Sequence, residues 1–254
     1  LLALNAVWGS AANDVWAVGG AGEVQHYDGT SWARVNSGLT VNLWAVWGSS
    51  AQDVWVAGEN GYIRRWTGSA FGTVSSSGAP MTGAYRAIWG SGPSDIWVVG
   101  DNATFWHYNG TSGAPVTTPY NNLPLWSIWG RSATDIWASA ALTAAGNVLH
   151  WNGQSWQQVS AQGGAEPAYT VVWGLPSAGP WIGAVTGALV QNTRGSWTLA
   201  PSVSKEILRG IWGSSENDVW VVGDNGAMLH WDGVEWRSYS EGVSNAWTAM
   251  WGSG

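Results

Sequence analysis

The sequence of 254 residues contains no cysteine and a single lysine, Lys205. Without cysteine no disulfide can contribute to stability, and cysteine usage gives no indication of the redox compartment. Only 10% of the residues are charged, and sixteen acidic residues against nine basic ones give a net charge of -7. Nucleic acids and anionic membranes are bound by basic surfaces, so we expect neither as a partner.

The chain also lacks a long apolar run and a helical pattern. No run is long enough to cross a membrane as a helix, and no signal-peptide pattern opens the chain, so no membrane insertion is expected. No window keeps a helical period over two turns, which favours an all-β protein. Because the chain begins at Leu1 rather than Met, we expect a mature or excised piece of a longer protein.

What the sequence has in abundance is tryptophan, with 24 residues arranged in a repeat. Trp-Gly occurs seven times at intervals of 39 to 44 residues, and Asp-Val-Trp or Asp-Ile-Trp follows it by eight residues in five of the first six copies. In the fifth copy Gly179-Pro180 stands in place of Asp-Val. The Trp-Gly tryptophans are Trp8, Trp47, Trp89, Trp129, Trp173, Trp212 and Trp251. A period near 40 indicates units that bury their apolar faces by stacking on one another.

Each repeat reads as four short strands separated by turns. In the second repeat the apolar runs are 43–48, 53–58, 62–66 and 71 onward, rich in Val, Ile and Trp and closed by Gly, Asn, Asp or Ser. Asn-Gly at 60–61 and at 225–226 predicts type I′ turns between the second and third strands, because both central residues need positive φ. The repeat is therefore predicted to be a four-stranded antiparallel meander.

Such units predict an all-β fold, a β-propeller of four-stranded antiparallel blades. We expect six blades, with seven as the alternative, in a single domain over residues 1–254. The repeats cover about 1–40, 41–82, 83–122, 123–167, 168–205 and 206–244, followed by an extra first strand at 245–254. We expect that strand to pair within a monomer in place of residues 1–10. It could instead begin a seventh blade or exchange into a second molecule.

The segment from Gly223 to Trp236, Gly-Asp-Asn-Gly-Ala-Met-Leu-His-Trp-Asp-Gly-Val-Glu-Trp, resembles the repeat of bacterial Asp-box (BNR-like) propellers, which include sialidase-type propellers and the photosystem II stability factor. Asp-Val-Trp followed by Gly, His and Trp-Asp-Gly is also similar to the repeat of sugar-binding propeller lectins of the Photorhabdus type. Both resemblances cover the whole chain through one degenerate blade signature. They imply the fold, and the second implies carbohydrate binding.

The recurring polar residues favour structural roles. All four histidines, His26, His107, His150 and His230, share one position of the third strand, where Arg65 and Gln191 stand in the other repeats. Since Arg and Gln are poor metal ligands, we expect this position to donate a hydrogen bond to a loop or to the neighbouring blade, and we expect no metal. The Asp of the Asp-Val/Ile-Trp motif is expected to accept backbone N–H bonds and hold the first turn.

Nothing in the sequence predicts catalysis. The eight arginines show no sialidase-type cluster, and there is no nucleophile elbow or phosphate loop. We therefore expect no catalytic residues, no cofactor and no enzymatic activity.

Binding residues are predicted at positions where the side chain differs between copies of the repeat, because packing does not determine it there. Three residues before the tryptophan of Trp-Gly, at what we call the minus-three position, large, polar and charged residues interchange. This position lies beside variable loops, where binding residues usually occur. Of the 24 tryptophans, Trp44, Trp106 and Trp126 are outside the core pattern of the repeat. The predicted ligand-binding residues are Trp44, Arg86, Trp106, Trp126 and Arg209.

Two functions are compatible with these features. The first is a non-enzymatic, multivalent, lectin-like propeller that binds glycans, supported by the aromatic excess and low charge. The alternative is a structural or protein-interaction module of a larger secreted or surface protein of bacterial origin. In either case we expect a secreted or cell-surface location.

Overall fold

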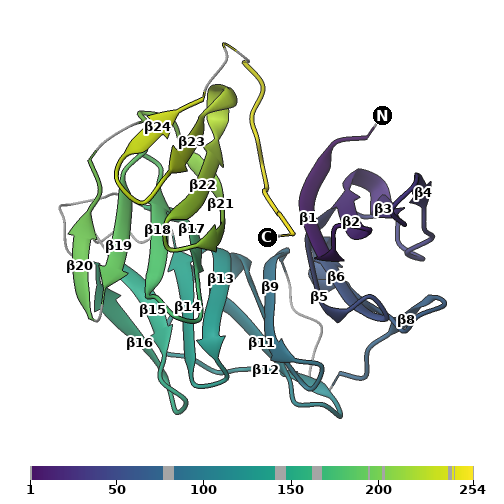
Figure 1. Cartoon of the computed structure of the whole chain (residues 1–254). Helices are drawn as coiled ribbons and strands as arrows, with labels where there is room; N and C mark the ends of the chain where they lie inside the picture. The colour runs from purple at the N-terminus through teal and green to yellow at the C-terminus, as the bar shows by residue number, and fades with distance from the viewer. Residues whose placement is uncertain are drawn as a thin grey trace. The chain divides into compact units, whose positions relative to one another are not determined.

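The computed structural model describes residues 2–76, 83–140, 147–161, 168–193, 195–201, 204–239, 242 and 244–253. Apart from the last two residues, the chain divides into two compact units, Leu1–Leu125 and Trp126–Gly252. Each of the six complete repeats forms one four-stranded antiparallel sheet (Figure 1). These sheets are the blades of a six-bladed β-propeller, which confirms the predicted fold class.

The first unit holds blades 1 to 3. Blade 1 consists of β1 (Leu4–Ala11), β2 (Asp14–Gly19), β3 (Val24–Tyr27) and β4 (Trp32–Arg34). Blade 2 consists of β5 (Leu43–Ser50), β6 (Asp53–Gly58), β7 (Ile63–Trp66) and β8 (Phe71–Thr73). Blade 3 consists of β9 (Tyr85–Gly92), β10 (Asp95–Gly100), β11 (Thr104–Tyr108) and β12 (Gly113–Pro115).

The second unit holds blades 4 to 6. Blade 4 consists of β13 (Leu125–Ser132), β14 (Asp135–Ala140), β15 (Asn147–Trp151) and β16 (Trp156–Ser160). Blade 5 consists of β17 (Tyr169–Gly174), β18 (Pro180–Ala184), β19 (Leu189–Thr193) and β20 (Ser196–Leu199). Blade 6 consists of β21 (Leu208–Ser215), β22 (Asp218–Gly223), β23 (Met228–Trp231) and β24 (Trp236–Ser238).

Four short 3₁₀ turns join the second and third strands of blades 1, 2, 3 and 6: η1 (Gly20–Gly22), η2 (Glu59–Gly61), η3 (Asp101–Ala103) and η4 (Asp224–Gly226). Asn60 and Gly61 have φ of 57° and 66°, and Asn225 and Gly226 have φ of 51° and 70°. Both Asn-Gly turns therefore have the positive φ values predicted from the sequence. No helix in the described part of the chain has the length and apolar character needed to span a membrane.

The eight-residue spacing of the two tryptophan motifs is a consequence of strand pairing. The first two strands of a blade are joined by a tight turn, which places the two tryptophans directly opposite each other, as in Trp8↔Trp16 and Trp212↔Trp220. Such cross-strand pairs are the stabilising unit of an antiparallel sheet. The motifs are thus two halves of one contact.

The glycine of Trp-Gly is explained by the neighbouring blade. A Cβ atom on Gly48 of blade 2 would lie 2.5 Å from Cη2 of Trp8 in blade 1. Gly90 meets Trp47 and Gly213 meets Trp173 in the same way, at 2.7 and 3.0 Å. In these pairs within a unit, one blade places its Trp-Gly tryptophan on the glycine of the next blade, and no larger residue fits there.

The minus-three residue lies at a β-bulge. In the pairing of the first two strands the register shifts between Leu4 and Ala6, Leu43 and Ala45, Tyr85 and Ala87, Tyr169 and Val171, and Leu208 and Gly210. A bulge leaves one residue outside the ladder and redirects its side chain. This explains why the minus-three residue varies while its neighbours remain apolar or small.

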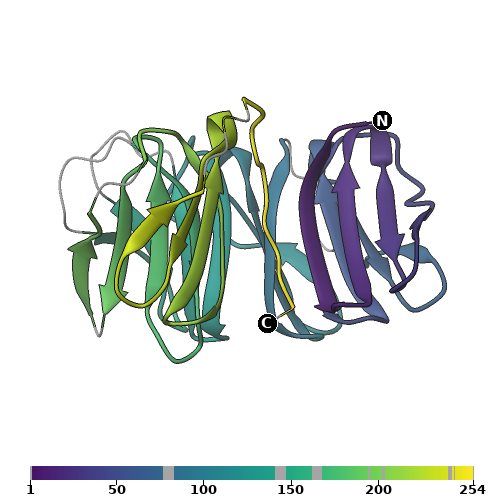
Figure 2. The ribbon, with the colours of Figure 1, turned by 45° about the horizontal axis from the view of Figure 1, so that its top comes forward.

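The described part of the surplus copy, residues 245–253, packs on blade 6, beside β21 (Figures 1 and 2). The backbone N–H of Trp247 donates to the carbonyl of Gly223 at 3.0 Å. Gly252 lies on Trp212, where an added Cβ would be 2.7 Å from Cη2, so this segment occupies the place of the next first strand. The N-terminal copy forms β1 and pairs with β2. The prediction that the surplus strand displaces residues 1–10 was therefore wrong.

Two tryptophans assigned to the core from the repeat pattern are exposed, Trp32 by 51% and Trp247 by 42%. Several counterparts in other copies are buried: Trp156 and Trp236 correspond to Trp32, and Leu43 and Leu208 to Trp247. The difference arises because burial at these positions depends on a neighbouring blade and not on the residue's own sheet.

The contact between tryptophan and glycine predicts a sharp steric effect. Gly48→Ala should destabilise the protein by about 1–3 kcal/mol, the usual cost of overpacking, because its Cβ would meet both Trp8 and the carbonyl oxygen of Asp53. Gly72→Ala in β8 is the matched control, since an added Cβ there has nothing within 4 Å. Urea unfolding measures both, and equal stabilities would contradict the packing described.

Removal of residues 245–254 should destabilise the protein by roughly 2–4 kcal/mol without changing its oligomeric state. The deletion uncovers Trp212, and burial of a large aromatic side chain contributes at about 25 cal/mol per Å². Urea unfolding and light scattering test the two parts of this prediction. A stable monomer produced from a dimer by the deletion would show that the segment had been exchanged between molecules.

Candidate functional site

The four histidines belong to a polar cluster repeated in blades 1, 3, 4 and 6. Each His lies opposite the tryptophan of the Asp-Val/Ile-Trp motif and stacks on its indole, with ring centroids 4.0–4.3 Å apart. Its Nε2 lies 2.6–2.8 Å from Oδ1 of the motif's Asp, which closes the first turn of the blade. In blade 2 Arg65 takes this place, with Nε 2.6 Å from Asp53 Oδ1. A hydrogen bond from this position to a loop or to the neighbouring blade was predicted; the bond is present, but its acceptor is the aspartate that begins the second strand of the same blade.

The aspartate is the centre of this cluster. Besides His or Arg it accepts a hydrogen bond from the indole of its own motif at 2.8–3.2 Å in blades 1, 2, 4 and 6. It also accepts one from a side chain of the first strand, as from Ser49 Oγ at 2.6 Å in blade 2 and from Arg131 Nε at 2.7 Å in blade 4. Backbone donors were predicted, and the donors found are side chains.

These hydrogen bonds determine the charge state of the aspartates. Burial is the largest single influence on Asp95 and Asp135 and raises the pKa of each carboxyl. The combined hydrogen bonds and charges around each carboxyl outweigh the effect of burial and lower both pKa values. They come from His107 and Ser91 at Asp95, and from Arg131 and His150 at Asp135. For Asp218 the hydrogen bond from Ser214 is the largest influence and lowers the pKa.

The geometry of the cluster differs from that of a Ser-His-Asp triad. A catalytic triad needs the imidazole between the nucleophilic hydroxyl and the carboxylate, so that it can take the proton. Here the carboxylate of Asp14 lies between Ser10 and His26, binding each directly. Among the described residues no three His, Asp or Glu side chains converge as potential metal ligands.

At the minus-three position the first unit brings two predicted site residues together. The guanidinium of Arg86 lies over the indole of Trp44 at 5.0 Å from the ring centroid. Its Nε and one terminal nitrogen bind the two carboxylate oxygens of Asp101 in η3 at 2.9 and 3.2 Å. Burial opposes ionisation of Asp101, but the bonds from Arg86 and the backbone of Ala84 lower its pKa overall. Arg86 is 37% exposed.

The second unit repeats part of this arrangement. Arg209 binds Asp224 of η4 through Nε and a terminal nitrogen at 2.7 and 2.9 Å. The hydrogen bond to Asp224 is the largest influence on the pKa of Arg209 and raises it. Trp126, at the same position of blade 4, is 37% exposed. Nothing in the structure of this unit brings Trp126 and Arg209 into contact.

Two other minus-three residues bind the next blade instead. Asn5 Nδ2 donates to the carbonyl of Leu43 at 2.8 Å. Thr170 is buried and its hydroxyl donates to the equivalent carbonyl, that of Leu208. The minus-three position is thus a junction between blades where Asn or Thr stands, and a surface feature where Arg or Trp stands.

Trp106 is not a surface residue, which corrects its assignment to the binding site. It lies in β11, is 2% exposed and belongs to the core between blades 2 and 3. A Cβ on Gly113 of β12 would lie 1.6 Å from its ring, so glycine makes room for the indole. The repeat pattern gave no sign of this, because the compensating glycine lies on a different strand.

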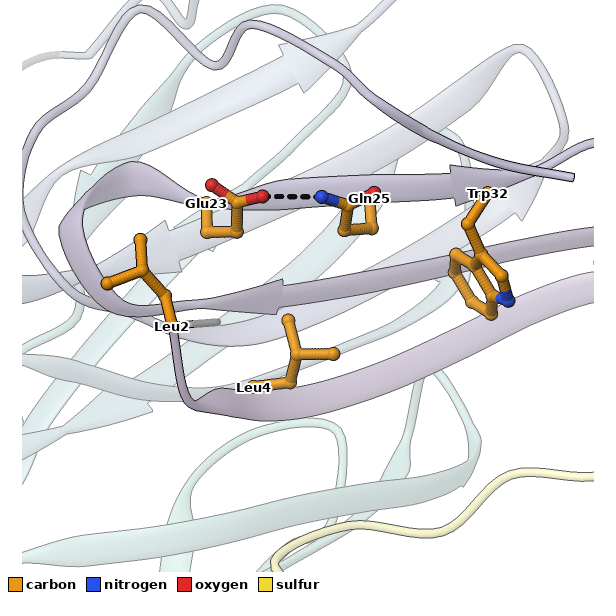
Figure 3. A pocket seen from close by; sticks show the side chains of 5 residues that line it. All are labelled: Leu2, Leu4, Glu23, Gln25 and Trp32. Carbon is orange, nitrogen blue, oxygen red and sulfur yellow. Dashed lines mark hydrogen bonds between the residues drawn. The ribbon is translucent and has the colours of Figure 1, made fainter.

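A pocket on blade 1 was missed from the sequence. It has a volume of about 290 Å³ and is lined by Leu2, Leu4, Glu23, Gln25 and Trp32 (Figure 3). Leu4 is 47% exposed, whereas its equivalents Leu43, Leu125 and Leu208 are fully buried. The alignment of repeats predicts a core position here, so no signal in the sequence indicated the pocket.

Comparison with known proteins supports the fold. No protein-family model and no curated protein matches the sequence. Among solved structures, YCF48 bound to D1 peptide is similar with a TM-score of 0.72 and 16% identity, over 93% of this chain and 80% of that one. YCF48 from Cyanidioschyzon merolae gives 0.71 and 16%, over 97% and 87%. The WD40 β-propeller domain of Doa1 gives 0.73 and 12%, over 93% and 81%. These likenesses show a β-propeller; a specific likeness to Asp-box propellers or propeller lectins is not among them.

The lowered aspartate pKa values predict acid sensitivity. A carboxyl whose pKa is lower in the folded state stabilises the fold above its unfolded pKa of about 3.9, and this stabilisation is lost as the pH falls through the folded value. We expect the free energy of unfolding to fall steeply below about pH 4. Asp95→Asn should reduce stability at pH 7 and flatten this dependence, as measured by urea unfolding across pH. An unchanged slope in the variant would contradict the role assigned to Asp95.

Proposed function

We propose that this chain is a non-enzymatic propeller module that binds a protein partner through its exposed minus-three residues. The observation that carries the proposal is the layered group of Trp44, Arg86 and Asp101 in the first unit. The group lies at a β-bulge, a device by which sheets redirect side chains at functional sites.

The chemistry of this group suits a polypeptide. A guanidinium has five N–H donors, and a carboxylate held by Nε and one terminal nitrogen uses two of them. Arg86 and Arg209 can therefore each offer further donors to backbone carbonyls while Asp101 and Asp224 keep them oriented. Because each Arg is already paired with a carboxylate, the site favours neutral carbonyl oxygens over a second acidic group.

The fold is compatible with such a role. One structural neighbour, YCF48, is described as bound to a D1 peptide. At 16% identity this supports the proposal only through the shared architecture.

A glycan is the second candidate ligand, and the exposed indole of Trp126 is the observation that favours it. A flat aromatic face packs on the C–H surface of a sugar, and its N–H can bond to a hydroxyl. The paired Arg and Asp side chains could equally bond to hydroxyl groups. The two candidates differ in the partner, and both use minus-three residues.

A displayed peptide library and a glycan array, screened with the same protein, decide between them. We expect peptides to be enriched, and Arg86→Gln and Trp44→Ala each to weaken the selected peptide at least tenfold. Arg237→Gln is the matched control for Arg86→Gln, because Arg237 also binds carboxylates but lies in the last strand of blade 6. Binding to glycans alone would establish the lectin, and binding unaffected by either variant would place the site elsewhere.

A further inference from the structure

Blade 5 lacks the aspartate around which the other blades build their polar cluster. Two residues before Trp181, where the other five complete repeats have the motif Asp, the chain has Gly179. A Cβ atom on Gly179 would lie 1.9 Å from the carbonyl oxygen of Asn192, so no side chain fits at this position. Blade 5 therefore cannot supply a carboxylate from the place that supplies it elsewhere.

The donors that bind this aspartate in other blades have counterparts in blade 5. Trp181 of β18 lies directly opposite Gln191 of β19. In blade 2 the same register joins Trp55 to Arg65. There both side chains donate to Oδ1 of Asp53, Trp55 through Nε1 at 3.0 Å and Arg65 through Nε at 2.6 Å. The indole and the amide of blade 5 are thus placed to donate to one shared carboxylate.

Neither donor is used within the described part of the protein. No described group accepts a hydrogen bond from the indole of Trp181 or from the side-chain amide of Gln191. Trp181 is 6% exposed and Gln191 is half-buried, and the polar side-chain atoms of neither residue are fully enclosed. Donors at such depth are normally paired with protein, water or a ligand. The acceptor for this pair therefore comes from outside the described chain.

The surroundings of the pair are formed within the second unit. Blade 5 is the middle blade of that unit, and Trp181 packs edge to face on Trp236 of blade 6 with ring centroids 5.5 Å apart. Leu189 and Leu208 belong to the same buried cluster. A donor held in place by packing loses little conformational entropy when it binds an acceptor.

We propose that blade 5 has a binding site for a carboxylate, to which Trp181 Nε1 and Gln191 Nε2 donate as their counterparts donate to the motif aspartate in other blades. The carboxylate belongs either to a small organic acid or to an acidic side chain of a partner, and the chemistry of recognition is the same. Both donors are neutral, so the hydrogen bonds lack the added strength of an ion pair and we expect weak affinity. The site is separate from the minus-three residues and from the peptide that they are proposed to bind.

The indole resonance of Trp181 tests this proposal directly. In a proton–nitrogen correlation spectrum its signal is the one that Trp181→Phe removes. Sodium acetate should shift this signal downfield in a saturable manner, because a hydrogen bond to an anion deshields the indole proton. Sodium chloride at equal ionic strength, and acetamide as a neutral analogue of similar shape, should shift it at least tenfold less.

A pair of matched variants tests the second donor. Gln191→Leu should weaken acetate binding at least tenfold, because it removes the amide and nearly keeps the size of the side chain. Gln158→Leu makes the same change at an exposed position of β16 in blade 4 and should have no effect. The remaining indole signals show whether each variant is folded. Equal responses to acetate and acetamide, an affinity unchanged by Gln191→Leu, or no saturable shift at molar acetate would overturn the proposal.

Two short peptides distinguish the sources of the carboxylate. Acetyl-Gly-Asp-Gly-amide presents the acidic side chain, and acetyl-Gly-Asn-Gly-amide is its neutral control, which should not shift the Trp181 signal. Binding of the Asp peptide at least tenfold tighter than acetate would support an acidic side chain of a partner. Binding no tighter than acetate would support a small organic acid.

Discussion

The contact on which this structure depends is a tryptophan ring placed against a glycine of the next blade. The ring of one blade occupies the space that a Cβ atom would need in the next blade. The residue that follows the Trp-Gly tryptophan of that next blade must therefore be glycine, as at Gly48 and Gly213. The opposite tryptophan on the second strand extends the same surface and meets aromatics of the following blade. One repeated contact therefore explains the Trp-Gly dipeptide, the second tryptophan motif eight residues later and the stacking of blades.

The polar cluster around each motif aspartate supports that contact. The Asp accepts a hydrogen bond from the indole N–H of the tryptophan in its own Asp-Val/Ile-Trp motif. His or Arg stacks on the same ring and bonds to the same carboxylate. The arrangement satisfies a buried indole and a half-buried carboxylate together, which removes the cost of leaving either without a partner. The histidines, aspartates and serines of these clusters thus help to hold the motif tryptophans in place.

Function is left to the positions that these contacts do not use. The bulge at minus-three frees one residue per blade, and the structure divides these residues between junctions, where Asn5 and Thr170 bind the next blade, and surface groups such as Trp44 with Arg86. Both features arise from one scaffold through small local departures.

The sequence by itself determined the blade: its four strands, its turns and the register of its tryptophans follow from a 40-residue period and from local patterns of apolar residues, glycine and asparagine. It also indicated Trp44, Arg86, Trp126 and Arg209, which are partly exposed, because a variable position in a repeat is visible without a structure. Only the tertiary structure decided which of these side chains meet, that Trp106 is core, and that Leu4 and Trp32 are exposed. The physical reason is that burial in a repeat protein depends on the adjacent unit, so identical residues in identical sheets have different surroundings.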